Sequence, residues 1–146
     1  MGAIYSLFAL LAGMGLPLQI GLNHMVAKAS TALWSSAISF VVGTIAMFAV
    51  VFATKQPIPT LQNLSTVPTF AWVAGLLGAF YVTTSIIAAP KIGAAALVTL
   101  VVTGQLIASL IIDHYGFAGF PQQSISFGRI AGALLLIAGV VLIKKF

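Results

Sequence analysis

The chain has 146 residues, of which 61% are hydrophobic and only 5% are charged, and its mean hydropathy is +1.19. Soluble domains carry about 25% charged residues, so this composition excludes a soluble globular protein and indicates an integral membrane protein. The net charge of +5 comes from cations scattered among the loops and chain ends. Because these cations form no basic stripe, we expect the lipid bilayer and not a nucleic acid as the partner.

Five strongly apolar segments take up most of the chain. A hydrocarbon core of about 30 Å needs about 20 apolar residues in a helix, and continuously apolar segments favour helices over the alternating strands of a barrel. We therefore expect an all-α integral membrane protein with one domain of five transmembrane helices. Their odd number places the two chain ends on opposite sides of the membrane. The predicted spans are residues 1–22, 31–54, 69–89, 93–112 and 127–143.

The loop charges give only a weak signal for orientation. Two cations fall on the side of the N-terminus and four on the other side, so the positive-inside rule places the second side in the cytoplasm by a difference of two. Insertion in both orientations is therefore compatible with the sequence. The first group is Lys55 and Arg129, and the second is Lys28, Lys91, Lys144 and Lys145.

The first two spans carry polar side chains at helical spacing. Gln19 and Asn23 share a face of the first span, and Pro17 in the same span predicts a kink that would open backbone groups to a cavity. Close packing against a neighbouring helix is the alternative. In the second span, Ser39 belongs to a stripe of small residues, for which helix packing is favoured over substrate contact.

The third and fourth spans add further candidates for a substrate pathway. Tyr81 and Ser85 lie four residues apart in the third span, and a buried phenol needs a hydrogen-bond partner. The fourth span carries a polar arc that is too wide to face lipid without cost and must face inward. Gln105 is its deepest large polar group, and Ser109 follows one turn later. Contact with a ligand and a hydrogen bond between helices stay open for Gln105.

The only carboxylate, Asp113, ends the fourth span. A negative charge gains nothing from the helix dipole there, so a salt bridge to Arg129 or an interfacial helix end is favoured over a role in proton coupling. His24 is the other titratable candidate. In an antiparallel pair of subunits, His24 of one copy and Asp113 of the other would lie on the same side of the membrane and could form a coupled site.

The fifth span places all of its glycines on one seam. Gly128 and Gly132 form a GxxxG pattern, and Gly139 continues the seam. This pattern is typical of helix association in membranes, and dimerisation is favoured over packing within the subunit.

The titratable side chains give no pattern typical of an enzyme. One carboxylate, two distant histidines and no cysteine make acid–base catalysis, a catalytic triad and a metal centre within one chain unfavourable interpretations. We therefore expect neither enzyme activity nor a cofactor nor a metal.

Several motifs follow one another over nearly the whole chain in the order found in a bacterial family. The motifs are Gln19–Asn23, Ser36–Thr44, Gly75–Gly78, Ala89–Gly93, Gly104–Ser109 and Asp113–Gly116. On these motifs the chain is similar to the YdcZ-like family, or domain of unknown function 606, of the drug/metabolite transporter superfamily. The resemblance implies a multi-pass protein of the bacterial inner (plasma) membrane that corresponds to one inverted half of a ten-helix transporter.

In its expected pairing of small antiparallel subunits, the chain also resembles the four-helix small multidrug resistance transporters, which work as antiparallel dimers. Those proteins use a glutamate in their first helix, whereas this chain has Gln19 near the corresponding end. Proton-coupled export of cations by that mechanism is therefore not expected, and a neutral or weakly polar substrate fits better than a strong cation.

We accordingly predict a protomer of a small-molecule secondary transporter or facilitator that works by alternating access as an antiparallel, dual-topology homodimer. The alternative is a non-transporting membrane assembly subunit or a partner of a paralogous five-helix protein, which would give a heterodimer. Neither the substrate nor a coupling ion follows from the sequence. The candidate pathway residues are Gln19, Asn23, Ser39, Tyr81, Ser85, Gln105 and Ser109.

Overall fold

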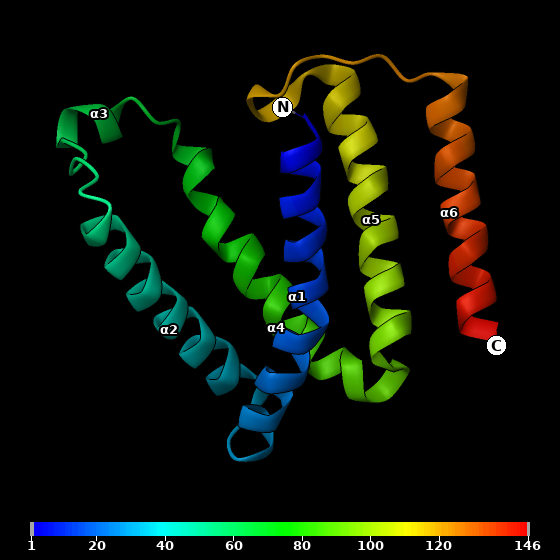
Figure 1. Cartoon of the computed structure of the whole chain (residues 1–146), viewed down its shortest axis with the longest axis horizontal. Helices are drawn as coiled ribbons and strands as arrows, with labels where there is room; N and C mark the ends of the chain where they lie inside the picture. Colours follow the sequence, from blue (N-terminus) through cyan, green and yellow to red (C-terminus); the bar gives the residue numbers. More distant parts are fainter. Residues whose placement is uncertain (1, 146) are drawn as a thin grey trace. The chain divides into compact units, whose positions relative to one another are not determined.

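The structure, a computed structural model, describes residues 2–145 apart from the side chain of Lys144. Within this range the chain consists of helices and their connections, and it contains no β-strand (Figure 1). This confirms the predicted all-α class. The elements are α1 (Gly2–Lys28), α2 (Ala32–Ala53), α3 (Leu61–Ser65), the 3₁₀ helix η1 (Thr69–Val73), α4 (Ala74–Ile92), α5 (Ala94–Tyr115), the 3₁₀ helix η2 (Phe117–Gly119) and α6 (Phe127–Lys145).

Four helical segments are long and apolar enough to cross a membrane. They are Gly2–Lys28, Ala32–Ala53, Thr69–Ile92 and Ala94–Tyr115, while the apolar stretch of α6, Phe127–Ile143, is shorter. The first four predicted spans therefore each correspond to a helical segment of membrane-crossing length. The fifth corresponds to a shorter apolar helix, and its role as a span stays a prediction.

The chain forms two compact units, Met1–Ala88 and Ala89–Phe146. The first unit holds α1, α2, α3, η1 and most of α4. The second unit holds the end of α4 together with α5, η2 and α6.

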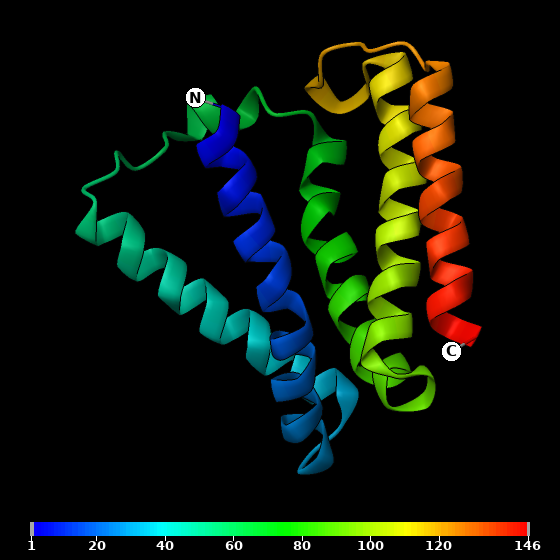
Figure 2. The ribbon, with the colours of Figure 1, turned by 45° about the vertical axis from the view of Figure 1, so that its right-hand side comes forward.

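Hydroxyl groups cap α2 and join it to the neighbouring long helices of the first unit, through Ser35 to α1 and through Ser36 to α4. Thr31 caps the start of α2 by accepting a 3.2 Å hydrogen bond from the backbone N–H of Trp34. Within the first turn of α2, the hydroxyl of Ser35 donates to the carbonyl of Asn23 in α1 at 2.6 Å. Figures 1 and 2 show α2 and α4 close together near this end and diverging toward α3. The unit is therefore a wedge that is narrow at the α1–α2 connection.

Several helices extend beyond the predicted spans. α1 continues through Pro17 and the polar residues after Leu22 as far as Lys28, because a helix satisfies its backbone hydrogen bonds whatever the polarity of its side chains. α4 likewise continues through Pro90 to Ile92, beyond the predicted end of the third span at residue 89, so the connection to α5 contracts to Gly93. This glycine has φ 84° and ψ 151°, a conformation that side chains strongly disfavour.

The second unit is built on an antiparallel pair, α5 and α6. Gly116 ends α5 in the left-handed conformation with φ 63°, which is the common glycine cap of a helix C-terminus. Leu97, Ala133 and Val140 supply the buried apolar side chains of the pair.

Candidate functional site

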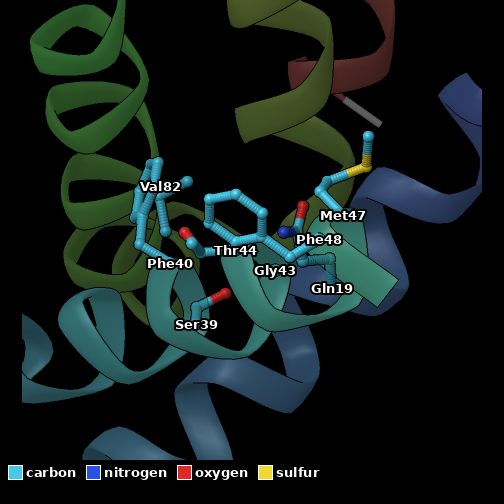
Figure 3. Close-up of a pocket in the computed structure, with 8 residues that line it drawn as sticks. All are labelled: Gln19, Ser39, Phe40, Gly43, Thr44, Met47, Phe48 and Val82. Atoms are coloured by element: carbon cyan, nitrogen blue, oxygen red, sulfur yellow. The ribbon is translucent and has the colours of Figure 1, made fainter. Parts of the chain in front are cut away.

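A cavity of about 430 Å³ lies between α1, α2 and α4 in the first unit (Figure 3). Small-molecule sites in proteins usually have volumes of about 300–1,000 Å³, so this cavity has the size of a solute site. All of its lining residues are uncharged: Gln19 from α1, Val82 from α4, and Ser39, Phe40, Gly43, Thr44, Met47 and Phe48 from α2.

The regular spacing of α2 creates most of this surface. Ser39, Gly43 and Met47 follow one another at four-residue steps, and the same spacing relates Phe40 to its own neighbours Thr44 and Phe48. Residues four apart lie above one another on a helix, so two adjacent rows form one face. This face is apolar at its end nearest to α3 and mixed in polarity toward the narrow end of the wedge.

A cluster of buried polar residues closes the cavity at the narrow end of the wedge. The hydroxyl of Thr83 in α4 donates a 2.9 Å hydrogen bond to the hydroxyl of Ser36 in α2. Ser35, Ser36, Ser85 and Asn23 are all buried. Small hydroxyl residues allow close helix approach and bond between helices in membranes. The cavity begins one helical turn beyond this cluster, since Ser39 and Gln19 each lie four residues from a member of it.

The polar groups of the cavity have unused hydrogen-bonding capacity. Among residues 2–145, the side chains of Gln19, Ser39 and Thr44 have no hydrogen-bond partner, whereas at the closed end the hydroxyls of Ser35, Ser36 and Thr83 are hydrogen-bonded. In Figure 3 the hydroxyl of Thr44 lies between the rings of Phe40 and Phe48. Gln19 and Thr44 are exposed and Ser39 is half-buried, so their polar atoms are accessible to water or to a ligand in the cavity.

The predicted pathway residues are distributed over three places. Gln19 and Ser39 line the cavity of the first unit, while Asn23 and Ser85 belong to its closed end. Tyr81 is half-buried on α4, but its neighbour Val82 is the residue that lines the cavity.

The other two predicted pathway residues lie on α5, in the second unit. Ser109 lines a second cavity there, and Gln105 is exposed and lines neither cavity. Their part in a substrate pathway stays a prediction.

The sequence interpretation did not assign Thr44, Met47, Phe48 or Val82 to the site. The four-residue spacing from Ser39 and Phe40 was the signal that could have identified the three residues on α2.

The second cavity, about 230 Å³, lies between α5 and α6. Arg129 and Asp113 face each other in its wall, with 3.2 Å between Nη1 and Oδ2. Their side chains are 30% and 31% exposed. This is the predicted ion pair, and it compensates the only carboxylate of the chain within its own unit. The remaining lining residues are Leu106, Ser109, Leu110, Gly132 and Ala133.

The loop after α5 is tied to the same ion pair. Arg129 also donates to the side-chain oxygen and the carbonyl of Gln123, whose backbone N–H donates to the carbonyl of Asp113 at 2.7 Å. The side-chain amide of Gln122 donates to the carbonyl of His114 at 3.0 Å. The other histidine, His24, is half-buried in the first unit, and its proposed coupling to Asp113 stays a prediction.

The glycine seam of α6 is open. A Cβ atom built at Gly128, Gly132 or Gly139 would meet no atom of the described chain within 4 Å. Within residues 2–145, no element therefore packs closely against these three glycines. The seam is available to a partner helix, and the predicted dimer contact stays a prediction.

The fold and the cavity together define an all-helical membrane protein with a solute-sized cavity lined by uncharged residues. No group of three or more potential metal ligands occurs among the described residues. The chain belongs to the family described as "Putative inner membrane exporter, YdcZ", whose sequence profile matches residues 4–142.

A relative in *Escherichia coli* (strain K12), named Inner membrane protein YdcZ, is 34% identical over 140 residues. The match covers 94% of this chain and 93% of that protein. No solved structure matches the chain. These comparisons confirm the predicted family, the inner-membrane location in a lipid bilayer, and a transporter family in place of an enzyme family.

Proposed function

We propose that the protein is one protomer of a small-molecule secondary transporter or facilitator whose substrate occupies the cavity between α1, α2 and α4. The observation that carries this proposal is the cavity itself. It has the volume of a solute site, an uncharged lining and unpaired polar groups, and hydrogen bonds close the wedge at one end. A transporter that works by alternating access needs a site that is closed toward one side of the membrane at a time.

The second part of the proposal is an antiparallel dimer of two five-span subunits. A 19-residue helix such as α6 rises about 28 Å at 1.5 Å per residue, close to the hydrocarbon thickness of about 30 Å. With α6 as a fifth span, each subunit is one inverted half of a ten-helix assembly. The open glycine seam and the weak loop-charge bias support pairing of two oppositely inserted copies.

Coupling in this assembly differs from that of transporters with a glutamate in the first helix. Residues 1–88 contain no Asp or Glu, and Asp113 is paired with Arg129 in the second unit. A substrate in the cavity therefore meets no carboxylate of the unit that surrounds it. We keep His24 and Asp113 of opposed subunits as the coupling candidates. Full transport activity in both alanine variants would exclude them.

Water access to the cavity separates transport from a purely structural role. The chain has no cysteine, so Ser39→Cys and Thr44→Cys can be treated in membranes with a maleimide without background. We expect both to react, because the thiolate, which forms in water, is the nucleophile that attacks the maleimide. Val42→Cys is the matched control: Val42 is exposed on α2 but does not line the cavity, and it should stay unlabelled in lipid. If neither cavity cysteine reacted, the non-transporting assembly subunit would be the better interpretation.

Topology is tested with cysteines in two loops that the proposal places on opposite sides of the membrane. Ala29 follows α1 and Ala118 follows α5, and both are exposed. A membrane-impermeant maleimide should label each site from both sides when subunits insert in both orientations. Labelling of each site from one side only, with opposite sides for the two, would rule out the dual-topology homodimer.

A further inference from the structure

We infer that the substrate of the α1–α2–α4 cavity is an uncharged, flat aromatic molecule of one or two rings that carries an amide-like hydrogen-bonding group. This inference rests on the proposed function, because it assigns the substrate class of the same cavity. Three properties of the lining carry it: aromatic walls, unpaired polar groups at one end, and the absence of charge from all lining residues.

Each aromatic ring of the lining has a neighbour outside the cavity. Phe40 lies against Gly78 of α4, where a Cβ atom would lie 3.4 Å from its ring carbon Cζ. Phe48 stacks on Phe52, with 6.2 Å between the ring centroids and 23° between the planes. Both lining rings keep free surface, since Phe40 is 39% and Phe48 is 58% exposed. A flat ring that stacks on this free surface in offset or edge-to-face geometry matches the lining.

The polar groups match a neutral ligand that both donates and accepts. The amide of Gln19 offers two donor hydrogens and an acceptor oxygen, and the hydroxyls of Ser39 and Thr44 can do either. None of the three has a hydrogen-bond partner within residues 2–145. A carboxamide can form two reciprocal hydrogen bonds with Gln19. A charged group finds no opposite charge on the lining residues, and burial of an uncompensated charge is strongly unfavourable.

Gly43 sets the free width of the cavity. It lies on α2 among the lining residues, and a Cβ atom there would meet no other atom of the described chain within 4 Å. A larger side chain at this position would therefore fill the cavity without a clash in the helix packing. Gly75 on α4 is the matched control, because its surroundings are equally open but it does not line the cavity.

Three probes of the same shape test whether the ligand must be uncharged, and a fourth tests whether it must contain an aromatic ring. Benzamide, protonated benzamidine and benzoate share one shape and differ in charge, while cyclohexanecarboxamide keeps the amide and lacks the aromatic ring. Binding of each is measured by equilibrium dialysis against the purified full-length protein in detergent micelles. Micelles of the same detergent without protein supply the background. We expect benzamide to bind at least about tenfold more tightly than either charged probe and about threefold more tightly than the cyclohexane analogue.

Two variants and one control connect the binding to the named residues. Gly43→Leu should weaken benzamide binding by at least about tenfold and Gly75→Leu should leave it unchanged. Gln19→Leu, which keeps the size of the side chain, should weaken it by about three- to tenfold. Tighter binding of benzamidine or benzoate, or equal binding to wild type and Gly43→Leu, would overturn the inference.

The maleimide experiment on Ser39→Cys and Thr44→Cys decides separately whether the cavity is open to water. A wet cavity that rejects benzamide leaves the transporter proposal intact and refutes the substrate class. A cavity that binds benzamide but cannot be reached by maleimide in the membrane supports the substrate class and refutes the transporter proposal.

Discussion

Thr83 and Ser36 join α4 to α2 through a 2.9 Å hydrogen bond between their hydroxyl groups. Toward α3 the two helices diverge (Figures 1 and 2), and the solute-sized cavity occupies part of the space between them and α1. This bond therefore lies where the wedge changes from closely packed helices to an open site, and it is a direct target for mutation.

Replacing Thr83 with valine removes this hydrogen bond and keeps the shape of the side chain. Hydrogen bonds between membrane helices contribute about 0.6 kcal/mol on average, and Ser36 would be left buried without this partner, so we expect a loss of about 1 kcal/mol in the free energy of unfolding. Unfolding in mixed detergent and SDS micelles, followed by circular dichroism, measures the change. Thr84→Val is the control because Thr84 is exposed. Equal stability of the two variants would show that the bond does not hold the narrow end closed.

The ion pair between Asp113 and Arg129 should show energetic coupling of modest size. Both side chains are about one-third exposed, and exposed pairs contribute about 0.2–1 kcal/mol. A double-mutant cycle with Asp113→Asn and Arg129→Gln should give a coupling energy near the upper end of this range, since Gln123 also bonds to the arginine. The same cycle with Lys91→Gln in place of Arg129→Gln should be additive. Lys91 precedes α5 and Asp113 lies in its last turn, about 30 Å apart along a helix of this length. Additivity in both cycles would remove the pair as a stabilising contact.

Gly93 should tolerate no side chain. Its φ of 84° and ψ of 151° fall in a region that is costly for every residue with a Cβ atom, by about 1–3 kcal/mol. We expect Gly93→Ala to lower the free energy of unfolding by this amount. Gly104→Ala, in the middle of α5, should instead be neutral or stabilising by up to about 1 kcal/mol, because alanine is the better helix former and the position is open. The reverse order of stability would contradict the assigned conformation of Gly93.

Sequence patterns predicted the helices better than their ends. Continuous apolar segments identified every long helix, because lipid demands apolar surfaces and internally bonded backbone. The end of the first span was predicted six residues early, since the polar residues after Leu22 mark where the apolar surface ends and not where the helix ends. The same reasoning explains why Pro90 and Lys91 lie inside α4 and not in a turn.

The site was predictable only in its polar members. Gln19 and Ser39 were identified because a polar side chain in a membrane span is costly unless it faces a cavity or a hydrogen-bond partner. The pairing of Asp113 with Arg129 followed from their opposite charges. Phe48 and Val82 were missed because apolar side chains facing lipid and apolar side chains facing a cavity look alike in a sequence. Gln105 lines neither of the two cavities, and because a polar arc on one helix does not specify which neighbour it faces, its place in a pathway stays a prediction.

The glycine seam of α6 provides the last prediction, which concerns the dimer. Gly128 and Gly132 have the GxxxG spacing that lets two helices approach closely in a membrane. Gly132 also lines the cavity between α5 and α6, whereas Gly128 lines neither cavity and its surroundings within the described chain are open. A larger side chain at Gly128 should therefore leave the fold of the subunit unchanged and keep the partner helix away. We expect Gly128→Ile to weaken dimerisation at least about tenfold, which corresponds to about 1.4 kcal/mol. The dimer fraction would be measured by single-molecule photobleaching of labelled protein in liposomes over a series of protein-to-lipid ratios.

Gly104→Ile is the matched control, because Gly104 is equally open but lies on α5. If both variants dimerised like the wild type, the contact between subunits would have to use a surface other than the glycine seam.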